Sequence, residues 1–223
     1  MFKRGCVAIA LVLLVAHPAL AGAWMRDKGH GFVSSTVNAN RDGGTTSTYL
    51  EYGLTDRVTL GADMFMTYDV QGTRDGYGTL FLRHALGPTD RANKWALVGG
   101  GGVAVIGFEV LPFLKTGLSW GRGYQLGTRQ GWIAVDSAVL WDLTYAQHVH
   151  KLDTAIGLAL TPRLRGLFEV YLDRTNGTTT TTLAPSLLIQ TGAKRQYTLQ
   201  IGAEIPRDDR SAATLTIGFW NTF

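Results

Sequence analysis

The chain has 223 residues, of which 45% are hydrophobic and 17% charged, with a formal net charge of +4 at pH 7. Such a small basic excess argues against a dedicated nucleic-acid binder, because the Lys and Arg residues of such a protein dominate one face. The single cysteine, Cys6, lies in the N-terminal segment described next. The rest of the chain therefore has no thiol for a disulfide or a cysteine-bound metal ion.

Residues 1–23 have the three parts of a secretory signal peptide. Lys3 and Arg4 precede an apolar stretch, residues 5–16, and small residues follow at alternate positions up to Ala23. We expect cleavage after residue 21 or after residue 23, and the sequence leaves both sites open. An uncleaved membrane anchor is the less favoured alternative, since the apolar run is shorter than the ~20 residues of a spanning helix. The remaining residues, 24–223, are expected to form one domain.

From residue 30 onward, apolar residues recur at alternate positions, which is the period of a β-strand. In "RVTLGADMFMTYD", the even positions from Val58 to Tyr68 are apolar, whereas Asp63 and Asp69 lie among the odd positions. The segments 197–205 and 213–219 alternate in the same way. Each segment therefore has one apolar and one polar face.

Turn-like sequences begin at residues 53, 87, 127, 161 and 192, at intervals of 34, 40, 34 and 31 residues. Each interval matches a hairpin of two strands of ~10 residues, whereas turns in soluble sandwiches recur every ~8–12 residues. We predict an all-β transmembrane antiparallel up-and-down β-barrel with twelve strands, an even number that places both termini on one side of the membrane. The predicted strands are 30–39, 45–54, 57–69, 77–86, 95–106, 109–121, 131–143, 150–160, 163–174, 180–191, 196–205 and 211–223.

The polar face of the strands contains nearly all the charges found in the middle of a strand. A charge that faced lipid would cost about 2–4 kcal/mol at the bilayer midplane, so these residues are expected to line the lumen. They are Glu51, Asp63, Arg83, Lys115, Asp136, Asp153, Arg165, Glu169 and Glu204, together with Asp69, Asp142 and Asp173. The nine carboxylates outnumber the three cations, which predicts a preference for cations. The alternative is a set of salt bridges that plugs and rigidifies the barrel.

Aromatic residues cluster near the predicted strand ends, as in the interfacial girdles of membrane barrels. We expect one girdle to contain Trp95, Trp120, Trp132, Tyr197 and Phe223, and the other to contain Tyr68, Tyr77, Trp141 and Tyr145.

The signal peptide, the alternating segments and the terminal Phe223 together resemble the outer-membrane β-barrel proteins of Gram-negative bacteria, of the porin or transporter kind. The stretches "AW…KGHG" and "YLEYGLTDRVTLG" are similar to a group of poorly characterised outer-membrane transporter-like proteins. The resemblance implies a place in the outer membrane, contact with its lipid bilayer, and recognition by the barrel assembly machinery. By resemblance, the recognition signal comprises Leu215, Ile217, Phe219 and Phe223, and Asn221 departs from the usual apolar pattern.

Two further patterns suggest chemistry only weakly. Gly99, Gly101 and Ala104 match G-x-G-x-x-A, but no helical pattern follows, so no nucleotide or other cofactor is expected. His148 and His150 suggest a metal site or an outer-membrane hydrolase, but no serine stands in a matching context. The expected function is therefore a narrow channel or transporter for small solutes or ions, and the protein is not expected to be an enzyme. A closed structural or partner-binding barrel and, less favoured, a hydrolase remain as alternatives.

Overall fold

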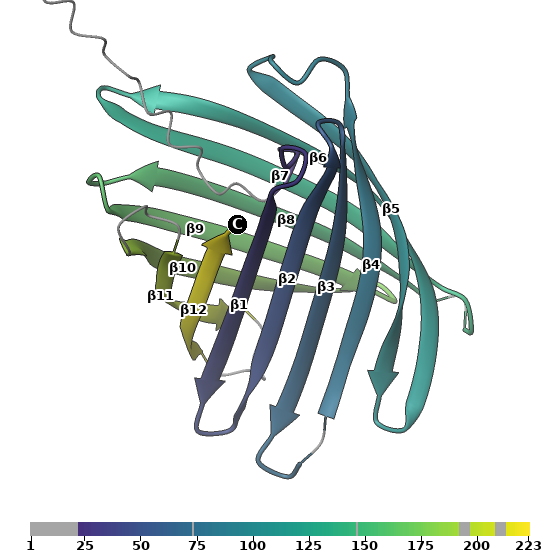
Figure 1. Cartoon of the computed structure of the whole chain (residues 1–223). Coiled ribbons are helices and arrows are strands. Elements are labelled where there is room, and N and C mark those ends of the chain that lie inside the picture. The colour runs from purple at the N-terminus through teal and green to yellow at the C-terminus, as the bar shows by residue number, and fades with distance from the viewer. Residues whose placement is uncertain (1–21, 73, 146, 192–196, 208–212) are drawn as a thin grey trace, which may run out of the picture.

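The computed structural model describes residues 22–72, 74–145, 147–191, 197–207 and 213–223, so most of the expected signal peptide lies outside the described residues. The described chain forms a closed barrel of twelve antiparallel strands (Figure 1). They are β1 (Gly31–Asn40), β2 (Gly43–Thr55), β3 (Val58–Asp69), β4 (Arg74–Leu86), β5 (Asn93–Ile106), β6 (Glu109–Leu126), β7 (Arg129–Asp142), β8 (His148–Ala159), β9 (Leu164–Thr175), β10 (Thr178–Thr191), β11 (Tyr197–Pro206) and β12 (Thr214–Thr222).

Each strand pairs with its neighbours in the chain, and β1 pairs with β12 to close the barrel. Figure 1 shows these two strands side by side. At the seam, the N–H of Gly31 donates to the carbonyl of Phe223 at 2.7 Å, and the N–H of Phe223 donates to the carbonyl of Gly31 at 3.0 Å. Closure matters because hydrocarbon offers no hydrogen-bond partner to a free strand edge.

The predicted strand ranges are confirmed to within a few residues. The largest difference is β6, which continues to Leu126 rather than ending at residue 121, because residues 122–126 still pair with β7. The alternation also holds: Met64 and Met66 of β3 are 52% and 50% exposed, whereas Asp63 and Phe65 point into the barrel. The apolar face therefore lies outside, the reverse of a soluble protein.

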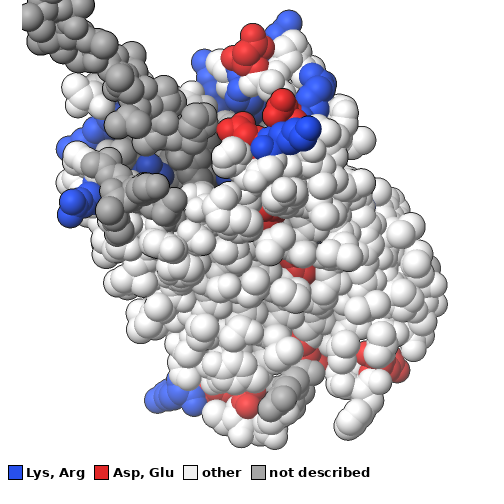
Figure 2. Space-filling view, in the orientation of Figure 1, with Lys and Arg blue, Asp and Glu red and all other residues white. Residues whose placement is uncertain are grey.

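The outer surface of the barrel has the charge distribution of a membrane-spanning wall. In the view of Figure 2, charged side chains gather at the two ends of the barrel, and the band between them is mostly uncharged apart from a few carboxylate atoms. Leucines, valines and isoleucines from most of the strands are exposed on this wall. No helix in the described part of the chain is long and apolar enough to cross a membrane.

The connections between strands are short at both ends of the barrel, from two to seven residues. Asn176 and Gly177 form a two-residue turn between β9 and β10, and their φ of 51° and 82° are those of a type I′ turn, which needs positive φ at both positions. We call the end with Gly31 and Phe223 the terminal end and the opposite end the loop end. The described residues of the loop-end connections form no lid over this end.

The glycines of β5 allow aromatic rings to cover the inside of the wall. A Cβ at Gly100 would lie 2.2 Å from the carbonyl oxygen of Leu80, and one at Gly102 would lie 2.9 Å from the ring of Phe113. The glycine run is thus part of a strand, as the sequence indicated, and its inward positions tolerate no side chain.

The aromatic girdles are only partly as predicted. Trp95, Tyr197 and Phe223 are exposed near the terminal end, and Tyr68, Trp141 and Tyr145 are exposed near the loop end. The prediction was wrong for Trp132 and Tyr77, which point into the barrel. Trp132 packs with Leu167 and Leu188, and Tyr77 donates a hydrogen bond to Asp63 at 3.2 Å. Both residues occupy inward-facing positions of their strands. The alternation of side chains along a strand therefore determines which way they point, even close to a turn.

Two substitutions in β4 test the lipid-facing assignment. Leu80, in the middle of the strand, and Leu86, at its end, are both on the outward face, 65% and 42% exposed. We expect Leu80→Arg to lower the free energy of unfolding in lipid vesicles by about 2–4 kcal/mol and the matched Leu86→Arg by at most about 1 kcal/mol, because the cost depends on depth. Equal costs, measured by denaturant titration, would contradict this orientation of the wall.

Candidate functional site

The lumen of the barrel contains a cavity of about 800 Å³. It extends from Ile106 and Asp142, at the loop end of their strands, to Gly22, which forms part of its floor near the terminal end. Along each strand, residues that line the cavity alternate with residues that face lipid. The cavity is therefore lined by the polar face of the strands.

The structure brings seven of the nine predicted lumen residues to this cavity: Asp63, Arg83, Lys115, Asp136, Asp153, Glu169 and Glu204. Glu51 also points inward but is completely buried beneath the cavity. Arg165 shares the inward phase of Leu167 on β9, near the terminal end, and does not line the cavity. Asp142 and Asp173 line it as well, whereas Asp69 lies at the loop end of β3.

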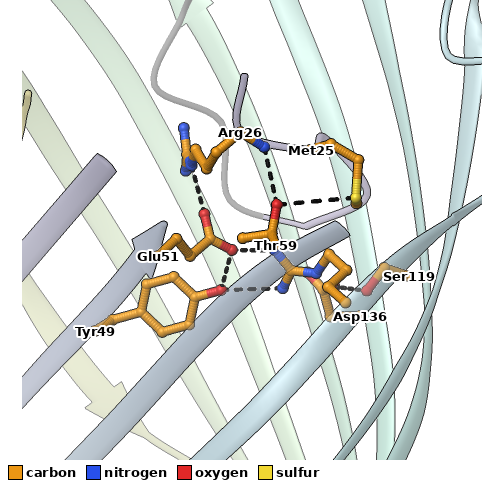
Figure 3. Close-up of polar contacts among 8 residues, drawn as sticks. Met25, Arg26, Tyr49, Glu51, Thr59, Ser119 and Asp136 are labelled. Carbon is orange, nitrogen blue, oxygen red and sulfur yellow. Dashed lines mark hydrogen bonds and ion pairs between the residues drawn. The ribbon is translucent and has the colours of Figure 1, made fainter. Parts of the chain in front are cut away.

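Glu51 is the centre of a buried ion-pair network (Figure 3). Nε of Arg26 donates to its Oε2 at 2.6 Å, and the hydroxyl of Tyr49 donates to its Oε1 at 2.5 Å. Nη1 of Arg83 forms an ion pair with the same oxygen, while Nη2 donates to the Tyr49 hydroxyl at 3.0 Å. Two guanidinium groups therefore compensate one carboxylate, which repays part of the desolvation cost of a buried charge.

Arg26 belongs to a stretch before the first strand that enters the barrel at the terminal end. We call residues 22–28 the inner segment. Its backbone N–H at Arg26 donates to Thr59 Oγ1 at 3.0 Å, and the Thr59 hydroxyl contacts the sulfur of Met25 at 4.0 Å (Figure 3). A parallel bridge joins Lys28 to Gly53 of β2. The inner segment thus narrows the terminal mouth.

Aromatic packing fixes the inner segment to the far wall. The ring of Trp24 lies over Gly121 of β6, where a Cβ would be 2.3 Å from the ring. The same side chain packs against the cluster of Trp132, Leu167 and Leu188. Sequence reasoning missed this segment, because seven residues before the first strand have no period that distinguishes them from a linker.

Two further ion pairs lie in the lumen, one at mid-strand and one, Lys151–Asp173, closer to the loop end. Nζ of Lys115 is 3.9 Å from Asp63 and 4.9 Å from the centroid of the Phe81 ring. Nζ of Lys151 is 3.0 Å from Oδ1 of Asp173. Sequence reasoning also missed Lys151, although its spacing of two residues from Asp153 would have placed it on the inward face. Such pairs are compatible with the alternative of a salt-bridged lumen, and whether they plug and rigidify the barrel stays a prediction.

The remaining carboxylates gather on one side of the lumen, over β7 to β11. Asp136 and Asp153 are directly opposite each other on β7 and β8, and Oδ1 of Asp153 has no hydrogen-bond partner among the described residues. Glu169 pairs with Ala184 on β10, and Glu204 on β11 accepts a hydrogen bond from Asn38 at 2.9 Å. Altogether seven carboxylates and three cations line the cavity, so its negative excess lies mainly on this wall.

The other residues that the sequence singled out lie away from the cavity. His148 and His150 alternate with the inward Lys151 and so face outward, and His148 packs edge-on against Trp141 with ring centroids 4.8 Å apart. Within the described ranges, no group of three or more His, Cys, Asp or Glu side chains is placed to hold a metal ion. Leu215, Ile217, Phe219 and Phe223 are exposed on the outer wall.

A closed antiparallel barrel with an apolar wall and a charged interior is a transmembrane barrel of the outer-membrane kind. Its fold is similar to that of the KdgM porin, with a TM-score of 0.58 and 7% identity over 86% of this chain and 99% of that one. It is likewise similar to the NanC porin, with a TM-score of 0.57 and 13% identity over 86% of this chain and 98% of that one. The similarity to LpxR from Salmonella typhimurium has a TM-score of 0.53 and 9% identity over 86% of this chain and 99% of that one. No family model matches the chain, and no curated protein matches it.

Removing one partner from the buried network tests its role in stability. We expect Arg83→Met to lower the free energy of unfolding by about 3–5 kcal/mol, because Glu51 keeps its charge in a dry site with one compensating group fewer. The double variant Glu51→Gln with Arg83→Met should recover most of this loss in the same denaturant titration. Arg41→Met, which removes an exposed ion pair with Asp42, should leave the midpoint unchanged. A double variant no more stable than Arg83→Met would contradict the pairing.

Proposed function

We propose that the protein is a narrow outer-membrane channel that lets small cationic or polar solutes diffuse down their gradient. The observation that carries this proposal is the cavity of about 800 Å³, lined by seven carboxylates and three cations. Rings of acidic side chains favour cations in a pore, because they replace part of the lost hydration with a negative potential.

The positions of the charged side chains, as well as the excess of carboxylates, support a preference for cations. The three cations of the lining are all engaged: Arg83 with Glu51, Lys115 with Asp63, and Lys151 with Asp173. After these pairings, Asp136, Asp153, Glu169 and Glu204 contribute negative charge on the wall from β7 to β11. An anion would meet this wall without a lining side-chain cation left to attract it.

The acidic excess of the lumen also indicates whether the ligand of a similar structure would suit this barrel. The KdgM porin has been solved in a complex with disordered oligogalacturonate, whose units carry carboxylates. The acidic excess of the present lumen would repel such a chain. We therefore propose small cations and uncharged polar solutes, and not acidic oligosaccharides, as what passes.

The inner segment is the one observation that supports the second candidate, a closed barrel that conducts nothing. Trp24 packs onto both the β6 wall and the Trp132 cluster, and Arg26 joins the Glu51 network, so the terminal mouth is partly filled. In this alternative the cavity would be a solute-binding cup that opens at the loop end. Conductance distinguishes the two, since only the channel passes current.

Catalysis is not part of the proposal. His148 and His150 face outward, away from the carboxylates of the lumen, and the described parts of the short connections provide no wall for an external active site. Turnover of phospholipid or lipopolysaccharide that disappears in His148→Ala or His150→Ala would favour a hydrolase.

For folding in the cell, we propose that the barrel assembly machinery recognises Leu215, Ile217, Phe219 and Phe223, which the last strand presents on the outer wall.

Ion selectivity in planar bilayers tests the channel. We expect the refolded protein to conduct and its reversal potential in a KCl gradient to show a cation preference. A unit charge about 4 Å away is worth about 1 kcal/mol in water, so the double variant Glu169→Gln with Glu204→Gln should lower the cation-to-anion permeability ratio several-fold.

The matched control is Asp90→Asn, which removes an exposed carboxylate from the connection between β4 and β5. Its selectivity should equal that of the wild type. A chain that passes no current at any voltage would instead support the closed barrel, and a conducting chain with anion preference would contradict the role of the acidic wall.

A further inference from the structure

The first described residues of the chain are packed inside the lumen. Ala23 is 2% exposed, and Gly22 lines the cavity. A Cβ at Gly22 would lie 3.1 Å from Oδ2 of Asp136 and 3.2 Å from the Cβ of Ala134, and its φ is +96°. Both the close approach and the positive φ favour glycine at this position. Residues 22 and 23 are therefore built into the barrel with the rest of the inner segment.

Within the described residues, Asp136 forms no ion pair with a cationic side chain. Its Oδ1 accepts a hydrogen bond from Ser119, and it stands directly opposite Asp153 on the neighbouring strand. Like charges directly opposite each other destabilise a sheet. The nearby cation Arg83 uses both Nη atoms for Glu51 and Tyr49. The Asp136–Asp153 pair therefore has room for one more positive charge, on the side of Asp136 that Gly22 approaches.

We propose that signal-peptide cleavage occurs after Ala21 and that the new α-ammonium group of Gly22 is the counter-ion of Asp136. A signal peptidase would hydrolyse the peptide bond between Ala21 and Gly22 with one water molecule. The departing segment keeps the new carboxylate, and Gly22 keeps the amine, which is protonated at neutral pH. Processing thus creates a charge at a point that a signal peptide would otherwise occupy with a neutral amide.

The geometry places the two groups within reach. The α-nitrogen is two bonds from the Cβ position that lies 3.1 Å from Asp136 Oδ2, so it lies within about 6 Å of that oxygen, the range in which an opposite charge stabilises a carboxylate. Cleavage after Ala23 would remove both buried residues, and Asp136 would keep its hydrogen bond from Ser119 but have no ammonium group beside it. The inference depends on the expected signal peptide and not on whether the barrel conducts.

The first test is the intact mass of the protein purified from outer membranes of cells that express the full chain. The expected mass corresponds to residues 22–223. A mass lower by one Gly and one Ala residue, or one that retains residues before Gly22, would overturn the proposal, whatever the stability of any variant.

The second test measures whether the ammonium group and Asp136 interact. Transamination with pyridoxal 5′-phosphate converts an N-terminal amine to a neutral carbonyl without adding bulk. Hydrogen bonds to charged groups contribute about 1.5–3 kcal/mol, so in the untreated protein Asp136→Asn should speed unfolding in detergent about tenfold. In the transaminated protein, the same substitution should have no effect or slow unfolding, because it relieves the repulsion from Asp153.

Equal effects of Asp136→Asn on the two forms would overturn the ion pair. Glu204→Gln is the control, since Glu204 is bonded to Asn38 on another part of the wall, and it should act equally on both forms. If Asp136→Asn does not fold, transamination of the wild type alone decides the question: it should accelerate unfolding several-fold, and an unchanged rate would contradict the proposal.

Discussion

The structure depends on one constraint, which is that hydrocarbon provides no hydrogen-bond partner for a peptide group. Every strand must therefore be paired on both sides, and the chain satisfies this by joining β1 to β12 through the reciprocal bonds of Gly31 and Phe223. Closure in turn gives each strand an inside and an outside. The apolar residues must take the outside, so the charges of the strands are collected in a narrow interior, where they must be compensated.

Because that constraint acts on every strand, the sequence predicted most of the fold. Alternation gave the phase of each strand, and the recurring turns gave their number. The misplaced residues show the limit of this reasoning. Trp132 and Tyr77 were assigned to girdles from their closeness to turns, yet both are on the inward phase, where Trp132 joins the inner cluster and Tyr77 donates to Asp63. The position of a residue in the alternation of its strand predicts the direction of its side chain better than its distance from a turn does.

The candidate site was predictable only as far as it consists of strand residues. The wall carboxylates follow from alternation, and Lys151 would have followed from its spacing to Asp153. The inner segment does not follow, since Trp24 and Arg26 reach their places through contacts with Gly121 and Glu51, which lie far along the chain. Such long-range packing leaves no local period. It matters because Arg26 supplies one of the two charges that compensate Glu51.

The uneven distribution of charge around the lumen has a consequence for any solute that enters. Most of the lumen carboxylates lie on the wall from β7 to β11, whereas the charges of the opposite wall are largely matched, as in the Lys115–Asp63 pair. The electric field inside the barrel therefore has a component across the axis as well as along it. A dipolar molecule in the cavity would be rotated until its positive end faced β7 to β11, so its dipole moment, and not its width alone, would decide how it lies there.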